Sequence, residues 1–198
     1  TRVALMEVLA VGAEVVSVID TLSVEYDPTG KKIIRGIEQA IKEIGLNKKI
    51  INGSTEDNIK TNETGVGITV VGIINRDDLR ISCSNRGDVL AAVGVPLVGE
   101  EVLENKDLAA DIIDLQKLSK KNYVKEILPV GSKGIKYEAE LMAQMSNLNL
   151  DYKQGLNLDL KKSAGPATVI LLSLTQDGLL KLRNDFSNKP VNLIGKFK

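Results

Sequence analysis

The chain of 198 residues carries 26 basic and 26 acidic side chains, a single cysteine and no histidine. This length suits one large or two small domains, and the balanced charge predicts neither a nucleic-acid nor a membrane partner. The lack of histidine excludes Ser-His-Asp and Cys-His catalysis and nearly all zinc sites. Any chemistry must therefore rest on carboxylates, lysines, backbone amides and a hard cation.

Signals of cellular location point to the cytoplasm. No apolar run approaches the ~20 residues that span a bilayer, and no signal peptide is visible. The single cysteine, Cys83, excludes an internal disulfide framework and fits a reducing cytoplasm. It lies in a strand-like segment, residues 79–83, where an inert buried thiol is expected. The chain opens at Thr1 inside a helical pattern, so we expect a further segment to precede it.

The first half of the chain alternates between helix and strand patterns. They predict a buried helix over residues 2–11, a strand over 15–24, an amphipathic helix over 33–44, and strands over 49–51, 65–74 and 79–83. A polar run at residues 84–88 is the expected boundary between two domains, 1–87 and 88–198.

The second half also mixes helices and strands. Its patterns predict strands over residues 89–95, 124–130, 168–174 and 190–195, and helices over 100–104, 109–118, 134–144 and 175–186. Because no regular βαβ rhythm is visible, the α+β class is favoured over a doubly wound sheet.

The polar segment 52–58 is the first candidate site. Glu56 and Asp57 are adjacent carboxylates at a predicted strand end, and Gly53 before them allows the backbone to approach a ligand. Such a group suits a hydrated Mg²⁺ that carries phosphates. A surface turn is the alternative, because Gly, Ser, Asn and Asp are common turn residues.

Two further carboxylates are candidates to join this loop. Glu7 is the only charge inside the first helix, so it needs a polar partner or a position on a wet edge. Asp20 lies near the end of its strand, and taken alone it is expected to face solvent. If the first helix packs over the strands, Glu7, Asp20, Glu56 and Asp57 could converge, and a metal ion would relieve their repulsion.

A second loop, Gly131-Ser132-Lys133-Gly134, precedes a predicted helix. Free amides and the positive end of the helix dipole favour an anion there. The glycine spacing of a P-loop is absent, so a plain turn at the helix start is the alternative.

Four segments in the same order resemble the aminoimidazole ribonucleotide synthetase-like (PurM-like) superfamily. They are residues 6–14 with the strand carrying Asp20, residues 53–56, residues 87–94 and residues 190–195. Two departures are visible: Met6-Glu7 stands where the superfamily has Asn-Asp, and Asn52 replaces the first glycine of its Gly-Gly-acid-Thr loop. Within the superfamily, residues 53–58, 94–102 and 128–135 look most like α-ribazole kinases.

The resemblance implies a two-domain α+β fold, with an N-terminal sheet forming a barrel in a homodimer and a C-terminal α/β sandwich-like domain. It implies ATP and Mg²⁺ in the N-terminal domain, and another metal-binding aspartate before Thr1. The implied activity is phosphorylation of α-ribazole to α-ribazole 5'-phosphate. The residues assigned on this basis are Glu56, Asp57, Glu7 and Asp20 for metal, and Gly53, Thr55, Asn58, Gly131, Ser132 and Gly134 for nucleotide. No general base is identified.

Three alternatives stay open. The first is an ATP-consuming synthetase or cyclase of the same superfamily. The second is a nucleotide-binding protein without catalysis, because the Asn-Asp and Gly-Gly pairs have changed. The third is a structural dimerisation module whose acidic loop is only a turn.

Overall fold

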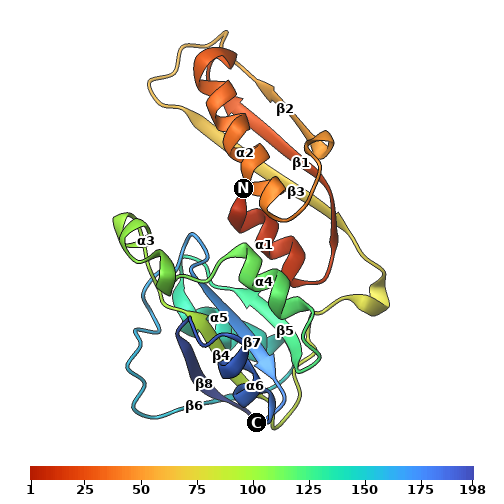
Figure 1. The fold of residues 1–198 in the computed structure, drawn as a ribbon, viewed down its shortest axis with the longest axis vertical. Coiled ribbons are helices and arrows are strands. Elements are labelled where there is room, and N and C mark those ends of the chain that lie inside the picture. Colours follow the sequence, from red (N-terminus) through yellow and green to blue (C-terminus); the bar gives the residue numbers. More distant parts are fainter.

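Two separate β-sheets, each with helices packed on it, make up the computed structural model, which describes residues 1–198 (Figure 1). The first sheet has three strands in the order β2-β1-β3, and the second has five in the order β5-β7-β4-β8-β6. The strands are β1 (Glu14–Ser23), β2 (Ile51–Thr55), β3 (Gly65–Ile73), β4 (Val89–Gly94), β5 (Val124–Pro129), β6 (Leu150–Tyr152), β7 (Val169–Leu174) and β8 (Val191–Phe197). The α-helices are α1 (Arg2–Ala10), α2 (Lys31–Glu43), α3 (Glu100–Glu104), α4 (Ile112–Ser119), α5 (Gly134–Met145) and α6 (Gly178–Asp185).

The three-stranded sheet is built around β1, which pairs in parallel with β2 and antiparallel with β3. Alternate residues of β1 are buried from Val18 to Leu22, as expected for a strand with one covered face. The apolar side of α2 covers this part of the molecule, and its Ile37 and Ile41 belong to the same hydrophobic cluster as Val18.

Helix α1 joins the two halves of the molecule (Figure 1). Its Leu5 and Met6 are fully buried in a 24-residue cluster that also contains Leu115 of α4 and Leu172 of β7. The helix contacts β1 and β3 on one side, and α4 and β5 on the other. The apolar composition of residues 2–11 therefore has a clear cause, because this helix is surrounded by protein on several sides.

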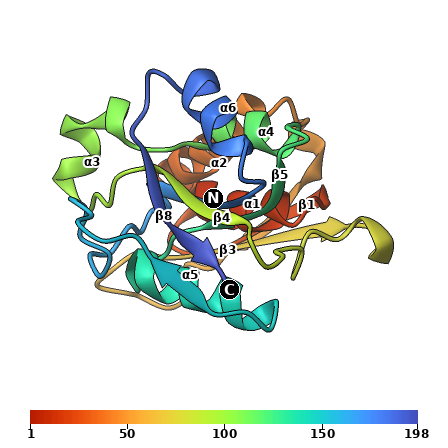
Figure 2. The same cartoon turned by 90° about the horizontal axis from the view of Figure 1, so that it is seen from below.

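The five-stranded sheet has helices on both faces. Val89, Ala91 and Val93 of β4 face the cluster that includes α1, α4 and α6, whereas Leu90 and Ala92 face a second cluster formed with α5. Figure 2 shows α5 on the opposite side of the sheet from α4 and α6. Burial on both faces explains why β4 and β7 are continuous apolar runs rather than alternating ones.

The α+β class and most predicted elements are confirmed. The strand predicted at 79–83 is wrong: this segment is irregular, Ser82 has a φ of 60°, and the backbone amides of Ser82 and Cys83 donate to the carboxylate of Glu126. The loop predicted at 52–58 is shorter than expected, because residues 52–55 belong to β2.

Two larger expectations are not decided by the structure. Strands β1–β3 and β4–β8 fall on either side of the predicted boundary at residue 87, but α1 shares the core of the second half, so the division into two domains stays a prediction. Neither sheet closes on itself, and the dimeric barrel likewise stays a prediction. No helix combines the length and apolar character needed to cross a membrane.

Candidate functional site

The carboxyl of Asp20 is the buried polar feature of the three-stranded sheet. Asp20 on β1 lies opposite Gly53 on β2, and only 3% of its surface is exposed. The expectation that Asp20 faces solvent is therefore wrong. A Cβ atom at position 53 would overlap the Asp20 carboxyl, so glycine is required there by the side chain it faces. Burial raises the pKa of Asp20, because little water remains to solvate the ionised form.

A small cavity of about 230 Å³ opens beside this pair. Its lining offers oxygen atoms of several kinds: a carboxylate, an amide, hydroxyls and backbone carbonyls. The residues that line it are Asp20, Tyr26, Ile34, Ile51, Asn52, Gly53, Ser54 and Thr55. The side-chain methyl of Thr55 also lies 3.2 Å from the place of a Cβ on Gly30, so Thr55 packs against the start of α2.

Glu56 and Asp57 line a different cavity, of about 470 Å³, together with Glu25 and Glu63. Both residues are exposed, and the Glu56 carboxylate accepts a hydrogen bond from the backbone amide of Asn58 at 2.8 Å. This local bond is typical of a turn. The predicted segment 52–58 is thus divided between two cavities, one at Asp20 and one at Glu56 and Asp57.

Glu7 lines neither of these cavities, and the charge of Glu138 on α5 acts on it. The residue keeps an exposed surface, which agrees with a position on the wet edge of α1. Surrounding protein and the like charge of Glu138 together raise the pKa of Glu7 to about 7. The influence of Glu138 was not predicted from the sequence, because it depends on where the fold places two residues that are far apart in the chain.

The Gly131–Gly134 loop is held by hydrogen bonds to the carbonyl of Gly131. The amide of Gly134 donates to this carbonyl at 3.3 Å, and the amide of Ala164 donates to it at 3.1 Å. Gly134 has a φ of 81°, and a Cβ there would stand 2.8 Å from the Lys161 carbonyl. Its glycine is thus explained by packing, whereas Ser132 is exposed.

No three acidic or cysteine side chains lie close enough together to hold a metal ion. Asp20, the Glu56–Asp57 pair and Glu7 occupy three separate places, so the structure does not bring the four carboxylates together. Their assignment to metal, and that of the loop residues to nucleotide, remains a prediction.

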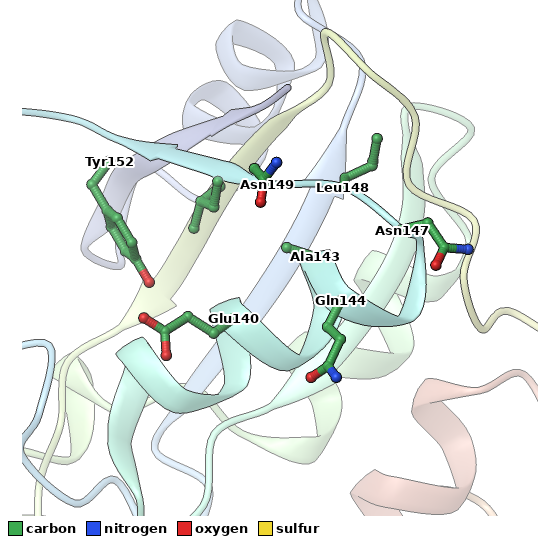
Figure 3. Close-up of a pocket in the computed structure, with 8 residues that line it drawn as sticks. Glu140, Ala143, Gln144, Asn147, Leu148, Asn149 and Tyr152 are labelled. Carbon is green, nitrogen blue, oxygen red and sulfur yellow. The ribbon is translucent and has the colours of Figure 1, made fainter.

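Another cavity, of about 530 Å³, lies outside these places, in a groove between α5 and β6 (Figure 3). Glu140 and Tyr152 lie toward one end, and Gln144 and Asn147 toward the other. Burial and the Glu140 charge raise the pKa of Tyr152 to about 12, so its hydroxyl stays protonated at neutral pH. None of the predicted site residues lines this groove.

The first part of the chain is similar to a known protein family. Residues 1–74 match the model of AIR synthase related protein, N-terminal domain. The match contains α1, β1, α2, β2 and β3, and with them Asp20 and Gly53. No match to a curated protein sequence was found.

Solved structures resemble the whole chain, including the part beyond residue 74. PurLQS from Thermotoga maritima has a TM-score of 0.68 at 15% identity, over 98% of this chain and 36% of its own. HypE from E. coli has a TM-score of 0.72 at 14% identity, over 98% of this chain and 72% of its own. A HypE structure in complex with ATP has a TM-score of 0.72 at 14% identity, covering 100% and 69%. The chain therefore has a PurM-like fold, and it spans about a third of the PurL chains.

Proposed function

We propose that the protein binds Mg-ATP and transfers the γ-phosphoryl group to the hydroxyl of a small nucleoside-like alcohol, with α-ribazole as the best candidate. The observation that carries the proposal is the buried Asp20 carboxyl opposite Gly53, beside a cavity lined by oxygen donors. The fold supports it, since the similar chain HypE is known in complex with ATP and PurL from Thermotoga maritima with ATP, ADP and AMPPCP. The preference for α-ribazole comes from the sequence resemblance of residues 53–58, 94–102 and 128–135.

The donor set fits Mg²⁺. This ion is usually held in proteins by one or two carboxylates together with water and substrate phosphates, rather than by an all-protein cage. Asp20 would supply the carboxylate, Ser54 and Thr55 hydroxyls, and Glu56 and Asp57 water-bridged contacts. Bound there, Mg²⁺ would neutralise phosphate charge.

The chain's own residues have simple tasks in this proposal. Gly53 leaves room for the Asp20 carboxyl at the edge of the cavity, and the cavity would position a phosphate beside that carboxyl without a histidine. Ser132, on the second loop, is exposed and would donate to a phosphate oxygen. We place the protein in the cytoplasm, on the evidence of its single cysteine.

The test is ADP release from Mg-ATP with a panel of nucleosides that includes α-ribazole. Asp20→Asn and Asp57→Asn should lower turnover at least about tenfold, whereas Asp77→Asn, an exposed carboxylate without a partner, should not change it. Binding of ATP without ADP release on any nucleoside would contradict the kinase, and unchanged turnover in both site variants would contradict the assigned site.

We also propose a homodimer formed through the three-stranded sheet. Its edge strand β3 and the neighbouring β1 expose apolar side chains: Val16 is 39% exposed, Val71 40% and Ile73 60%. An exposed apolar edge strand is normally covered. Sedimentation should show a dimer that Ile73→Lys converts to a monomer and that Leu180→Lys on α6 leaves intact; a monomeric wild-type protein would contradict this.

A synthetase is the second candidate. The observation that favours it is the similarity to phosphoribosylformylglycinamidine synthase II from Thermotoga maritima, with a TM-score of 0.63 at 16% identity over 96% of this chain and 35% of its own. ADP release that requires an amide substrate, and not an alcohol, would favour the synthetase over the kinase.

A further inference from the structure

The segment that connects the two sheets, residues 79–88, has no regular structure but is held by specific hydrogen bonds. The first anchor is Glu126 of β5, which is only 5% exposed. Its carboxylate accepts from the backbone amides of Ser82 at 3.1 Å and Cys83 at 3.2 Å, and from the hydroxyl of Ser84 at 2.8 Å. A buried carboxylate that accepts three hydrogen bonds is costly to expose or to leave unpaired.

A second anchor lies next to the first. The ammonium group of Lys125 lies 2.7 Å from both carboxylate oxygens of Asp88, at the end of the connecting segment. Asp88 is 6% exposed and also accepts from the backbone amide of Asn85 at 2.7 Å. The same two neighbouring positions of β5 therefore bind the middle and the end of the segment.

A β-bulge makes this arrangement possible. Neighbouring side chains of a regular strand point to opposite faces. The pairing of β5 with β7 shifts register between Val124 and Glu126, and Lys125 is the unpaired residue of the bulge. The bulge interrupts the alternation, so that Lys125 and Glu126 both reach the connecting segment.

A third anchor ties the start of the segment to two helices. The backbone amide of Arg80 donates to the carbonyl of Val11, just after α1, at 3.0 Å. Its guanidinium donates to the carbonyl of Ser119 at the end of α4, at 2.6 Å. Arg80 thus joins the ends of the two helices whose packing links the halves of the molecule.

We propose that residues 79–88 form a latch that fixes the three-stranded sheet relative to the five-stranded sheet, with Glu126 as its central positioning residue. Without these three anchors, residues 79–88 would be a free connection between the two sheets. Its importance for activity rests on the proposed function, because the Asp20 cavity and the Gly131–Gly134 loop lie in different halves of the molecule. The latch itself can be tested without any nucleotide.

Cys83 provides a natural reporter of the latch. It is the only cysteine, it is partly buried, and its own amide is one of the groups bound by Glu126. Its thiol lies 3.6 Å from the Ile81 carbonyl and 3.9 Å from the Leu79 carbonyl, inside the segment. Opening of the latch would expose this thiol to a reagent.

The experiment measures the rate of Cys83 labelling by a disulfide reagent in the intact, nucleotide-free chain. Burial and, after it, the Glu126 charge raise the pKa of the Cys83 thiol. The labelling rate is therefore measured over a range of pH, which separates the accessibility of the thiol from its ionisation. Glu126→Gln should speed labelling of the thiolate at least about tenfold. The matched control, Glu140→Gln, changes an exposed carboxylate on α5 and should stay within about twofold of the wild-type rate.

A second variant keeps the test decisive if Glu126→Gln does not fold, as judged by circular dichroism. Ser84→Ala removes one hydrogen bond and leaves the carboxylate, and should speed labelling about threefold or more. Wild-type labelling rates in the folded variants would overturn the latch. Loss of the proposed ATP activity would not affect this result, because no nucleotide is present in the labelling experiment.

Discussion

The carboxyl of Asp20 occupies the space that a side chain on Gly53 would need, so the two residues are complementary across the parallel β1–β2 pair. Neighbouring strands rarely hold a carboxylate in such a position, because a buried acid loses its hydration. Here the small cavity beside the pair gives the carboxyl a polar opening.

Gly53→Ala should destabilise the protein by ~1–3 kcal/mol, because the new methyl group must displace the Asp20 carboxyl. The matched control is Gly36→Ala, on the exposed side of α2 with no atom within 4 Å of the new Cβ. That change should stabilise the helix by up to ~1 kcal/mol. Urea denaturation of both variants measures the contrast, and equal effects would contradict it.

Asp20→Asn should weaken Mg-ATP binding about tenfold or more while it keeps or increases stability at neutral pH. The pKa of Asp20 is raised in the folded protein, so its contribution to stability is present below the unfolded pKa of 3.8 and is lost as pH rises through the folded pKa. Asparagine does not ionise, so the variant does not lose this stability as pH rises. Calorimetric titration and denaturation measure the two effects; a less stable variant at neutral pH would contradict the burial argument.

Glu7→Gln should change the pH dependence of stability. Because the pKa of Glu7 rises from 4.5 to about 7 on folding, the stability that protonated Glu7 contributes is present below pH 4.5 and is lost as pH rises through about 7. Above that pH the free energy of unfolding of the variant should be higher than that of the wild type by ~1 kcal/mol. This value is smaller than the full pKa shift implies, because solvent screens an exposed carboxylate. Denaturation midpoints at acidic and alkaline pH test this. If Glu138→Gln left the Glu7 titration unshifted, the proximity of the two carboxylates would be contradicted.

Lys189→Met should cost ~3–5 kcal/mol, because it leaves Asp114 buried without its cation. The ammonium group lies 3.1 Å from the Asp114 carboxylate, and the two side chains are 10% and 6% exposed. Lys181→Met breaks a pair of similar length, 2.8 Å, on the surface of α6 and should cost less than ~1 kcal/mol. Adding Asp114→Asn to Lys189→Met should recover part of the loss in thermal denaturation; no recovery would contradict the pairing.

Local pattern was enough to predict most elements of the fold. The period-2 burial of β1, the amphipathic α2 and the continuous apolar runs of β4 and β7 follow from residues near each other in the chain. The error at residues 79–83 has a cause that is distant in the sequence. The amides of Ser82 and Cys83 donate to the carboxylate of Glu126, more than forty positions away, instead of to a neighbouring strand.

For the candidate site, too, some features followed from the sequence and others only from the tertiary structure. The sequence by itself determined which chemistry is available: no histidine, one cysteine, and carboxylates beside glycine in an order that resembles ATP-using proteins. Only the tertiary structure decided that Asp20 is buried against Gly53, that Glu56 and Asp57 line another cavity, and that the charge of Glu138 acts on Glu7. Composition limits the reactive groups a chain has, whereas their distances depend on strand register and helix packing, which are set by contacts between residues far apart in the sequence.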